Sequence, residues 1–318
     1  MAVSVAAWDR GAVATPEATT PMSPGPAPRL GGTGRTPPLP AGRGRFVPVL
    51  PGLDDLPALR EPTGEDELFV LEHRGHPAAT VLGLAFRLWS PPPAPDGELA
   101  TTAAYLPEAP AACQRLPAVC TGTIALQLRR DWLGDLVRTD AACAARRCGK
   151  QVDVAFSIGD YLDHHRPRAF RGVTYEPGGT GWLVLSGTEV RFRIPTIGDL
   201  VAALATADPE ETLAQRCVRP DQIPAALAHR IDRALGALAP SLVSDVTGNC
   251  PECGQQVSLR FDPVSYALAE LRGAAAGVHE QVWLLASAFG WRETEILRLP
   301  RRRRAIYAEL AERDRRGW

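Results

Sequence analysis

The 318-residue sequence lacks a strong net charge, a long apolar run and the residue order of a secretory leader. A formal net charge of −1 argues against a protein dedicated to nucleic acid or to a membrane surface. No apolar run approaches the roughly 20 residues that a membrane span requires. Asp9 and Arg10 follow only a weak apolar stretch, unlike a signal peptide. The sequence therefore predicts a cytoplasmic protein with no membrane partner.

Motifs of familiar enzyme classes are also missing. No serine lies in a nucleophile elbow, and no His-Glu-x-x-His motif occurs. His164 and His165 stand near Asp160 and Asp163, but the arginines beside them favour a solvated loop over a metal or acid–base site. We therefore expect no enzyme activity, no catalytic residue and no small-molecule substrate.

Composition divides the chain into four expected sections. Residues 1–45 are rich in proline, glycine and alanine, and have too few large apolar residues to form a core, so we expect a disordered arm. Residues 46–99 form a small section of unknown role, with a strand expected at 67–71 and a buried stretch at 78–89. Residues 100–261 are expected to form a core of cysteine knuckles and strands with helices, including one at 121–137. Residues 262–318 are expected to form a C-terminal helical lobe.

Four of the seven cysteines form the strongest pattern in the sequence. Cys143 and Cys148 precede Gly149, whereas Cys250 and Cys253 precede Gly254. Each Cys-Gly pair leads into an alternating strand with Gln, Val and Phe at matching offsets, which indicates an internal repeat. Thiolates bind zinc in a tetrahedron, and each knuckle supplies half of such a site. The pattern predicts one structural zinc with four ligands: Cys143, Cys148, Cys250 and Cys253.

Two other interpretations of these cysteines stay open. The knuckles could be metal-free relics whose cysteines are ordinary buried residues, or they could hold a redox pair. An odd number of cysteines in a long chain favours a reducing compartment over a disulfide framework. Cys113, Cys120 and Cys217 are expected to be small core residues.

The C-terminal section begins with a helix signal at Asp262 and Pro263. From Val264 to Phe289, apolar residues recur at spacings of three and four, which predicts one long helix that ends at Gly290. Gly273 and Gly277 lie on the side of this helix opposite the apolar residues, where a second element is expected to pack closely. Helices are expected at 293–299 and at 301–315, the latter with Ile306, Tyr307 and Leu310 on its apolar face. The predicted fold class is α+β, with two zinc-ribbon-like cysteine knuckles, short antiparallel strands and a C-terminal helical lobe.

The C-terminal lobe also carries the one basic concentration, formed by Arg298 and the arginines at 301–304. This run could be a solvated helix end, a contact for an acidic protein surface or a nucleic-acid contact. Trp283, Trp291 and Ile296 lie close to it in the sequence, so we expect aromatic and apolar surface where three helices meet. Interface hot spots favour Trp, Tyr and Arg. The residues expected to bind a partner are Trp291, Arg298, Arg302, Arg303 and Tyr307.

Several pieces of the sequence, in the same order, resemble the T-even-like baseplate hub assembly family of tailed phages and related contractile injection systems. The resemblance covers about residue 100 to the end and is densest from Cys250 onward. It is carried by the following segments: Leu106 and Pro107, the helix at 126–136, the first knuckle, Phe-Arg-Ile-Pro-Thr-Ile-Gly-Asp-Leu at 192–200, 213–217, the Cys-Pro-x-Cys-Gly knuckle, 278–291 and 293–307.

The resemblance implies a non-enzymatic role in building a tail baseplate, with baseplate or tail proteins as partners. We therefore expect an assembly or chaperone component of a contractile injection system or phage tail. The alternative from another class is a zinc-ribbon regulator that binds nucleic acid through the 298–304 surface. The near-neutral charge makes nucleic acid the weaker expectation.

Overall fold

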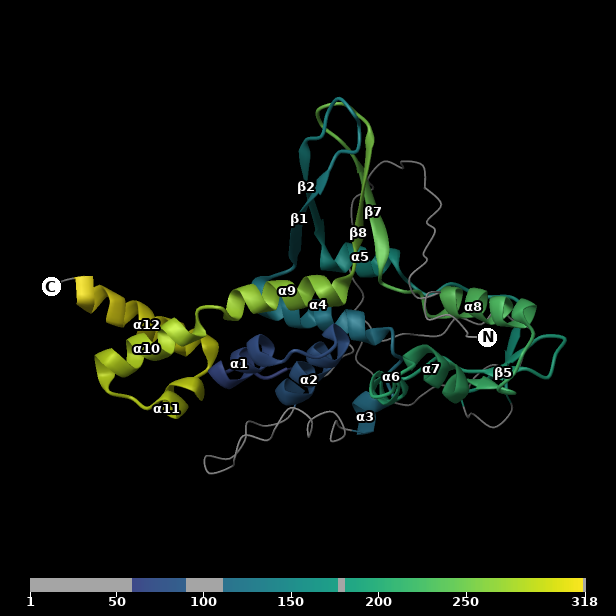
Figure 1. The fold of residues 1–318 in the computed structure, drawn as a ribbon, viewed down its shortest axis with the longest axis horizontal. Coiled ribbons are helices and arrows are strands. Elements are labelled where there is room, and N and C mark those ends of the chain that lie inside the picture. The colour runs from purple at the N-terminus through teal and green to yellow at the C-terminus, as the bar shows by residue number, and fades with distance from the viewer. Residues whose placement is uncertain (1–58, 90–110, 177–180, 317–318) are drawn as a thin grey trace, which may run out of the picture.

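The computed structural model of the chain describes residues 59–89, 111–176 and 181–316. A helical body lies at the centre, a narrow arm of two hairpins rises from it, and a small sheet unit and a C-terminal helical lobe lie at opposite ends (Figure 1). This mixture of helices and short antiparallel strands matches the predicted α+β class. Among the described residues, no helix is both long and apolar enough to cross a lipid bilayer. The expected disordered arm at 1–45 lies outside the described residues.

The helical body is formed by α1 (Gly64–Glu72), α2 (Pro77–Trp89), α4 (Cys120–Leu133) and α9 (Pro263–Ala275). One apolar core draws on all four helices, and Val81, Leu128 and Leu271 are fully buried in it. The expected buried stretch at 78–89 is confirmed as α2. The expected section boundaries at 99/100 and 261/262 run through this core, because its helices come from three of those sections.

The strand expected at 67–71 is wrong, since these residues lie in α1. The helix begins because the Asp66 carboxylate accepts hydrogen bonds from the N–H and the hydroxyl of Thr63, at 2.8 and 3.0 Å. Such a carboxylate three residues after a threonine satisfies backbone donors that a helix start leaves free. This start signal and burial of Phe69 and Val70 outweigh the strand propensity of the segment.

The arm consists of two antiparallel hairpins that stand side by side (Figure 1). The first pairs β1 (Leu136–Ala142) with β2 (Gln151–Ser157), and the second pairs β7 (Ser244–Asn249) with β8 (Gln256–Phe261). Each hairpin leads into a helix, α5 (Ile158–His164) or α9, whose first turn is capped by Ser157 or Asp262. The predicted internal repeat is therefore a repeated hairpin with its following helix. The helix expected at 121–137 ends at Leu133, because Gly134 turns the chain with a φ of 90° and Leu136 begins β1.

His164 and His165 close α5 and do not lie in a solvated loop. The ring of His165 is half-buried against Tyr161, with ring centroids 4.4 Å apart. Burial lowers the pKa of His165, even though its Nδ1 contacts the Tyr161 carbonyl oxygen at 2.8 Å. His165 is thus a packed residue at the base of the arm, whereas His164 is exposed.

The sheet unit is a four-stranded antiparallel sheet in the order β3-β4-β5-β6. Its apolar face packs on α8, and Phe192 and Ile231 are fully buried between them. Three further short helices link this unit to the body. The bounds are β3 (Val173–Tyr175), β4 (Leu183–Leu185), β5 (Arg191–Phe192), β6 (Val218–Arg219), α3 (Ala111–Gln114), α6 (Ile197–Leu204), α7 (Pro209–Cys217) and α8 (Ala225–Leu238).

The C-terminal lobe contains α10 (Val278–Phe289), α11 (Glu293–Leu297) and α12 (Arg301–Arg316) around a small core of its own. The predicted single helix from Val264 to Phe289 is wrong, because a turn at residues 276 and 277 separates α9 from α10. Gly277 leaves the helical conformation with ψ at 4°. A helix-interior glycine costs about 1 kcal/mol, and breaking the helix there lets Leu285 pack against Ala308 and Ala311 of α12.

The close packing expected at the two glycines of this segment is absent. A Cβ atom at Gly273 would meet nothing within 4 Å, and one at Gly277 would meet only Glu280 of the same helix. The close approach lies elsewhere, at Gly64, where a Cβ would come 2.9 Å from the Leu297 Cα. The lobe therefore docks on the first turn of α1.

Candidate metal centre and candidate docking surface

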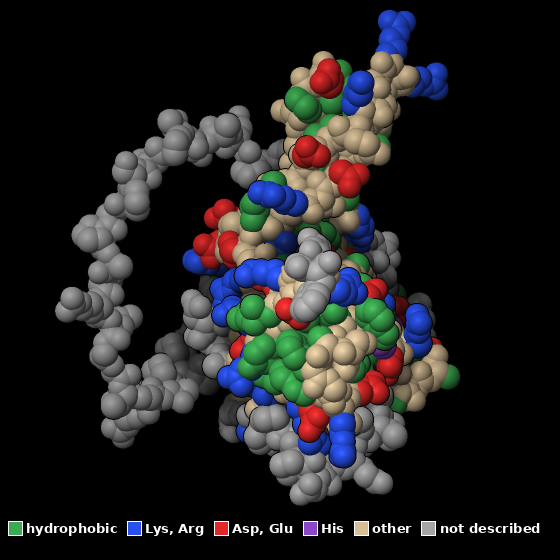
Figure 2. Space-filling view, turned by 90° about the vertical axis from the view of Figure 1, so that its left-hand side faces the viewer, with side chains coloured by type: hydrophobic (Ala, Val, Ile, Leu, Met, Phe, Trp, Pro, Cys, Tyr) green, Lys and Arg blue, Asp and Glu red, His purple; other side chains and the backbone are tan. Residues whose placement is uncertain are grey.

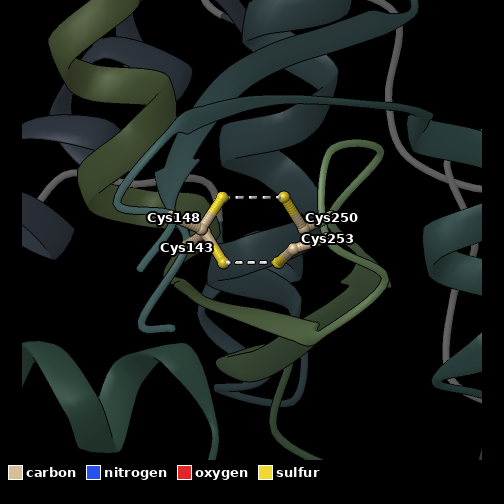
Figure 3. A group of neighbouring side chains, drawn as sticks. All are labelled: Cys143, Cys148, Cys250 and Cys253. Carbon is tan, nitrogen blue, oxygen red and sulfur yellow. Dashed lines mark hydrogen bonds between the residues drawn. The ribbon is translucent and has the colours of Figure 1, made fainter. Parts of the chain in front are cut away.

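The four predicted metal ligands meet at the tip of the arm, far from the helical body (Figures 1 and 3). Cys143 and Cys148 come from the loop between β1 and β2, and Cys250 and Cys253 come from the loop between β7 and β8. The thiols of the two hairpins face each other across the gap between them (Figure 3). The sequence pattern thus identified a set of residues that the fold does bring together.

The two knuckles close in the same way despite their different lengths. The Cys143 N–H donates to the Lys150 carbonyl at 2.9 Å, and the Cys250 N–H donates to the Gln255 carbonyl at 2.8 Å. The residue after each second cysteine is a glycine in the left-handed region, with φ of 58° at Gly149 and 70° at Gly254. Glycine adopts this conformation without the steric cost of a Cβ. The two additional residues between Cys143 and Cys148 are accommodated within the loop and do not displace the sulfurs.

The distances between the sulfurs suit a tetrahedral metal site. The Cys143 and Cys253 Sγ atoms lie 3.6 Å apart, the Cys148 and Cys250 Sγ atoms lie 3.7 Å apart, and all four lie within 4.8 Å of one another. A tetrahedron with metal–sulfur bonds of about 2.3 Å has edges of about 3.8 Å. A disulfide would require about 2.05 Å, and all seven cysteines are free. These four residues could therefore hold a metal ion.

The knuckle backbone also favours the thiolate form that a metal binds. Burial raises the pKa of Cys250, but hydrogen bonds from the backbone of Cys253 and Glu252 and from the neighbouring thiols lower it to about 7. Backbone hydrogen bonds from Lys150 and Gln255 also act to lower the pKa of Cys148 and Cys253, but burial and neighbouring thiols outweigh them and raise the pKa of both. Because thiolate is the form that coordinates metal, the hydrogen bonds to Cys250 favour metal binding at that ligand.

The arrangement suits a structural rather than a catalytic metal. A metal with four protein ligands keeps no open position for water or substrate. Cys143 and Cys250 are buried, Cys148 is half-buried and Cys253 is exposed. The three other cysteines are buried as expected, namely Cys113, Cys120 and Cys217. Burial raises the pKa of Cys120 and Cys217 to about 12, which keeps these two thiols protonated.

Of the five residues predicted to bind a partner, Trp291 and Tyr307 are in direct contact. Their ring centroids lie 5.2 Å apart at an interplanar angle of 84°, and Phe289 adds a third ring 5.1 Å from Trp291. Both predicted aromatic residues are half-buried, so each presents part of its ring to solvent. Arg302 and Arg303 are exposed on the first turn of α12.

The remaining predicted partner residue, Arg298, is exposed and lies beside α1. Its Nε lies 3.7 Å from a Glu65 carboxylate oxygen. Arg301 and Arg304 also face α1, and both pair with Glu67, which is almost fully buried. The basic run therefore divides by helical spacing: residues 298, 301 and 304 join the lobe to the body, and residues 302 and 303 point outward. The solvated and partner-contact interpretations therefore stay open for Arg298, Arg302 and Arg303, which are exposed.

The exposed apolar residues of α12 differ from those expected. Ile306 and Leu310 were expected on the buried face but are 56% and 47% exposed, whereas Ala308 and Ala311 are buried. Ile296, which was expected at the surface, is fully buried. Trp283 and Phe289 of α10 are 63% and 45% exposed.

We define the lobe surface as a set of residues that share this end of the molecule. On α12, Leu310 lies three residues from Tyr307 and four from Ile306, so the three side chains are helical neighbours. Tyr307 continues the surface to the Trp291 ring. Seen from this end, hydrophobic side chains gather with both basic and acidic side chains around them (Figure 2). The lobe surface comprises Phe289, Trp291, Arg302, Arg303, Ile306, Tyr307 and Leu310.

The acidic residues of α1 are the important side chains that the sequence did not point to. Asp66 accepts from Arg60 at 2.7 Å and from Arg87 at 3.1 Å, while Glu67 serves Arg301 and Arg304. The arginine spacing of three at 298, 301 and 304 was a signal that these side chains share one face of the chain. Nothing in the local pattern identified α1 as the partner of that face.

Comparison of the chain with protein-family models, with curated proteins and with solved structures finds no match. The basis for a role is therefore the cysteine cluster at the tip of the arm, the lobe surface at the other end and the resemblance of sequence segments noted above.

Proposed function

We propose that this protein is a non-enzymatic assembly or chaperone component of the baseplate of a contractile injection system or phage tail. The lobe surface is the single observation that carries the proposal. Several large apolar and aromatic side chains lie exposed together there, with two exposed guanidinium groups at one end. Exposed apolar clusters with polar borders are typical of protein–protein contacts. The resemblance to the baseplate hub assembly family, which is densest over these same residues, supports a baseplate protein as the partner.

We further propose that the metal at the tip is a structural zinc. Four thiolates in a tetrahedron form a ligand set that zinc favours in structural sites. Zinc also undergoes no redox change. Cys143, Cys148, Cys250 and Cys253 would hold it. When bound, the ion links the two hairpins and fixes the shape of the arm. The only non-cysteine residues buried in the apolar cluster at the tip, among those described, are the small Ala141 and Val257, so this link would be the main constraint there.

Charge reversal on the lobe surface tests the proposed partner contact. Arg302→Glu with Arg303→Glu changes two exposed side chains for which the described residues show no ion pair, so the fold should be kept. Truncating one hot-spot residue weakens binding by about 2 kcal/mol or more. We expect the double variant to lose capture of co-expressed baseplate proteins in a pull-down, with an unchanged circular dichroism spectrum.

Arg146→Glu with Arg147→Glu provides a matched control. These arginines are also adjacent and exposed, but they lie at the tip of the arm. Capture should survive in this control. Equal capture by wild type, test variant and control would contradict the proposed docking role.

The second candidate function is a zinc-ribbon regulator that binds nucleic acid. One observation favours it: Arg146, Arg147 and Lys150 are exposed beside the cysteine cluster at the tip. The expected surface at 298–304 favours it less, because three of its arginines pair with carboxylates of α1. Salt-dependent retention on DNA that is lost in Arg146→Glu with Arg147→Glu would support the regulator.

A further inference from the structure

A pocket of about 470 Å³ lies where the helical body meets α6 and α7 (Figure 1). The first turns of α2, α4, α7 and α9 border it, together with residues 241–243, which lead into β7. Pockets that hold small molecules are typically about 300–1,000 Å³ in volume and mainly apolar. Much of this lining is supplied by large apolar side chains, namely Leu200, Leu213, Leu242 and Val264. The pocket therefore suits a small organic molecule with an apolar body.

The helix starts around the pocket do not make it an anion site. The Thr121 N–H donates to the Ala118 carbonyl at 3.0 Å, and the Val264 N–H donates to the Asp262 carboxylate at 3.0 Å. Among the residues that the structure describes, no lysine or arginine lines the pocket, whereas Glu210 and Asp262 do. The charges around the pocket therefore favour a neutral or cationic ligand over an anion.

Glu210 is the acidic group of this pocket whose charge is not used. It is half-buried, and its side chain forms no hydrogen bond or ion pair within the described part of the chain. Asp262, by contrast, caps α9 and also accepts the Ser265 hydroxyl at 2.6 Å. The His76 ring adds no charge, because its Nδ1 accepts the Ala78 N–H at 3.2 Å and so carries no proton. A ligand with a cationic group would therefore supply the charge partner that Glu210 lacks.

Thr121 provides a second polar group that lacks a partner. It lines the pocket and is only 4% exposed. Its hydroxyl oxygen is buried and has no hydrogen-bond partner among the described residues. A buried hydroxyl that stays unpaired is costly, since it has lost its contacts with water. A polar atom of a ligand could pair with this hydroxyl.

We propose that this pocket binds a small aliphatic amine that carries a second hydrogen-bonding group, such as an amino alcohol. The ammonium group pairs with Glu210, and the second polar group forms a hydrogen bond with the Thr121 hydroxyl. The aliphatic chain between them packs against Leu213 and Leu242. An alkyl ammonium group has a pKa close to that of lysine, about 10.4, so it is charged at pH 7. The molecule is a ligand and undergoes no reaction in the pocket.

Two probes that differ in charge at one end test the role of Glu210. They are 6-amino-1-hexanol and 1,6-hexanediol, and their dissociation constants for the full chain are measured by ligand-detected NMR. We expect wild type to bind the amino alcohol at least about tenfold more tightly than the diol. Glu210→Gln should remove this preference. Glu211→Gln is the matched control and should retain it, because Glu211 is exposed on the same helix and does not line the pocket.

Hexylamine, which lacks the hydroxyl of 6-amino-1-hexanol, tests the role of Thr121. Thr121→Val keeps the shape of the side chain without its hydroxyl, whereas Thr121→Ser keeps the hydroxyl. In Thr121→Val, the ratio of the two dissociation constants should shift toward hexylamine by at least about fivefold relative to wild type. In Thr121→Ser, the same ratio should change by less than about twofold. Thr121→Val should not lower the melting temperature, because it removes an unpaired buried hydroxyl.

Several outcomes would overturn the proposal. Equal binding of the amino alcohol and the diol by wild type, absence of binding of either, or equal effects of Glu210→Gln and Glu211→Gln would each exclude the pairing with Glu210. Tighter binding of hexanoate than of 6-amino-1-hexanol would show that the pocket prefers an anion. An unchanged ratio in Thr121→Val would show that the ligand does not contact that hydroxyl. No residue of the lobe surface lines the pocket, so these results are independent of the pull-down that tests the baseplate role.

Discussion

The tip of the arm and the joint between the lobe and α1 both connect distant parts of the chain, but by different chemistry. At the tip, thiols 110 and 102 residues apart in sequence face each other across two hairpins. At the joint, Arg304 reaches Glu67 across 237 residues of sequence. The tip gathers four groups that repel one another as thiolates, whereas the joint pairs opposite charges. The first connection could therefore be completed by a metal ion, and the second is complete within the chain.

The residues around the cysteine tip support it less than the residues around the joint support the joint. The buried residues around the cysteines are small, chiefly Ala141 and Val257. At the joint, the Arg301 N–H donates to the Pro62 carbonyl at 2.8 Å, and Thr63 forms a β-bridge with Pro300. The joint is thus supported by backbone pairing and by the close approach at Gly64. The comparison predicts that the two ends of the molecule can be weakened independently.

Removing the metal should produce the largest effect and should confine it to the arm. Apparent zinc-binding free energies in small four-ligand sites are about 10–16 kcal/mol, which exceeds what the small tip core can supply. Elemental analysis should find about one zinc per chain in wild type and much less in Cys253→Ser. Amide hydrogen exchange should then rise in β1, β2, β7 and β8 and stay unchanged in α12.

Cys113→Ser gives the matched control, because Cys113 is buried in the helical body and is not part of the cluster. It should keep its zinc. A metal-free wild type with a fully protected arm would show that the tip is held together without a cation.

Breaking the joint should give the next largest effect, and here the lobe alone should respond. Glu67→Gln leaves Arg304, which is 1% exposed, without its charge partner. Removing one partner of a buried pair costs about 3–5 kcal/mol. Urea unfolding should show that loss of stability, while the zinc content stays that of wild type.

Two variants sharpen this result. Glu65→Gln removes a longer pair, 3.7 Å to an Arg298 side chain that is 42% exposed, and should cost less than about 1 kcal/mol. Glu67→Met with Arg304→Met should recover much of the lost stability, because it removes both buried charges. A double variant as unstable as Glu67→Gln would attribute the effect to lost packing rather than to an unpaired charge.

The two connections also differ in how far the sequence could predict them. The cysteine tip was predictable because each half is a local pattern, and the repeated Cys-Gly, Gln, Val and Phe offsets showed that two such halves exist. The joint was not, because Glu67 lies in a segment whose local pattern suggested a strand. Its partner Arg304 lies 237 residues away, and no short-range spacing carries that pairing. Only the recurrence of arginine at 298, 301 and 304 hinted at a buried charged face.

The C-terminal helices show the same limit. The apolar seam correctly identified Leu268, Leu271 and Leu285 as buried, since helical periodicity is a local property. It did not reveal that the chain turns at Gly277. The turn depends on packing of α10 against α12, which competes with continuing the helix and cannot be weighed from spacing alone. For the same reason, Ile306 and Leu310 were assigned to the wrong side of α12, whose buried face is made by alanines and Arg304.

A smaller effect than that of Glu67→Gln is expected at Asp199, a third carboxylate shared by two arginines. Asp199 accepts from Arg193 at 2.5 and 2.8 Å and from Arg216 at 2.8 Å. It resembles Glu67 in being buried, but Arg216 is 47% exposed, so its charges are better solvated. We therefore expect Asp199→Asn to cost about 1–3 kcal/mol at pH 7, less than Glu67→Gln.

The pH dependence tests this assignment. Burial raises the pKa of Asp199, but hydrogen bonds from Arg193, Thr196 and Arg216 outweigh it and hold the pKa well below its usual range. A carboxyl whose pKa is depressed by folding adds stability that is complete above its unfolded pKa of about 3.9 and is lost as the pH falls toward the folded pKa. The stability difference between wild type and Asp199→Asn should be full at pH 7 and should shrink below about pH 4. Asp163→Asn, which breaks an ion pair whose side chains are 66% and 73% exposed, should show almost no difference at either pH. If the stability difference between wild type and Asp199→Asn stays constant from pH 7 to about pH 3, the Asp199 carboxylate charge does not stabilise the folded protein. Asp199 would then resemble Glu67 only in its buried position.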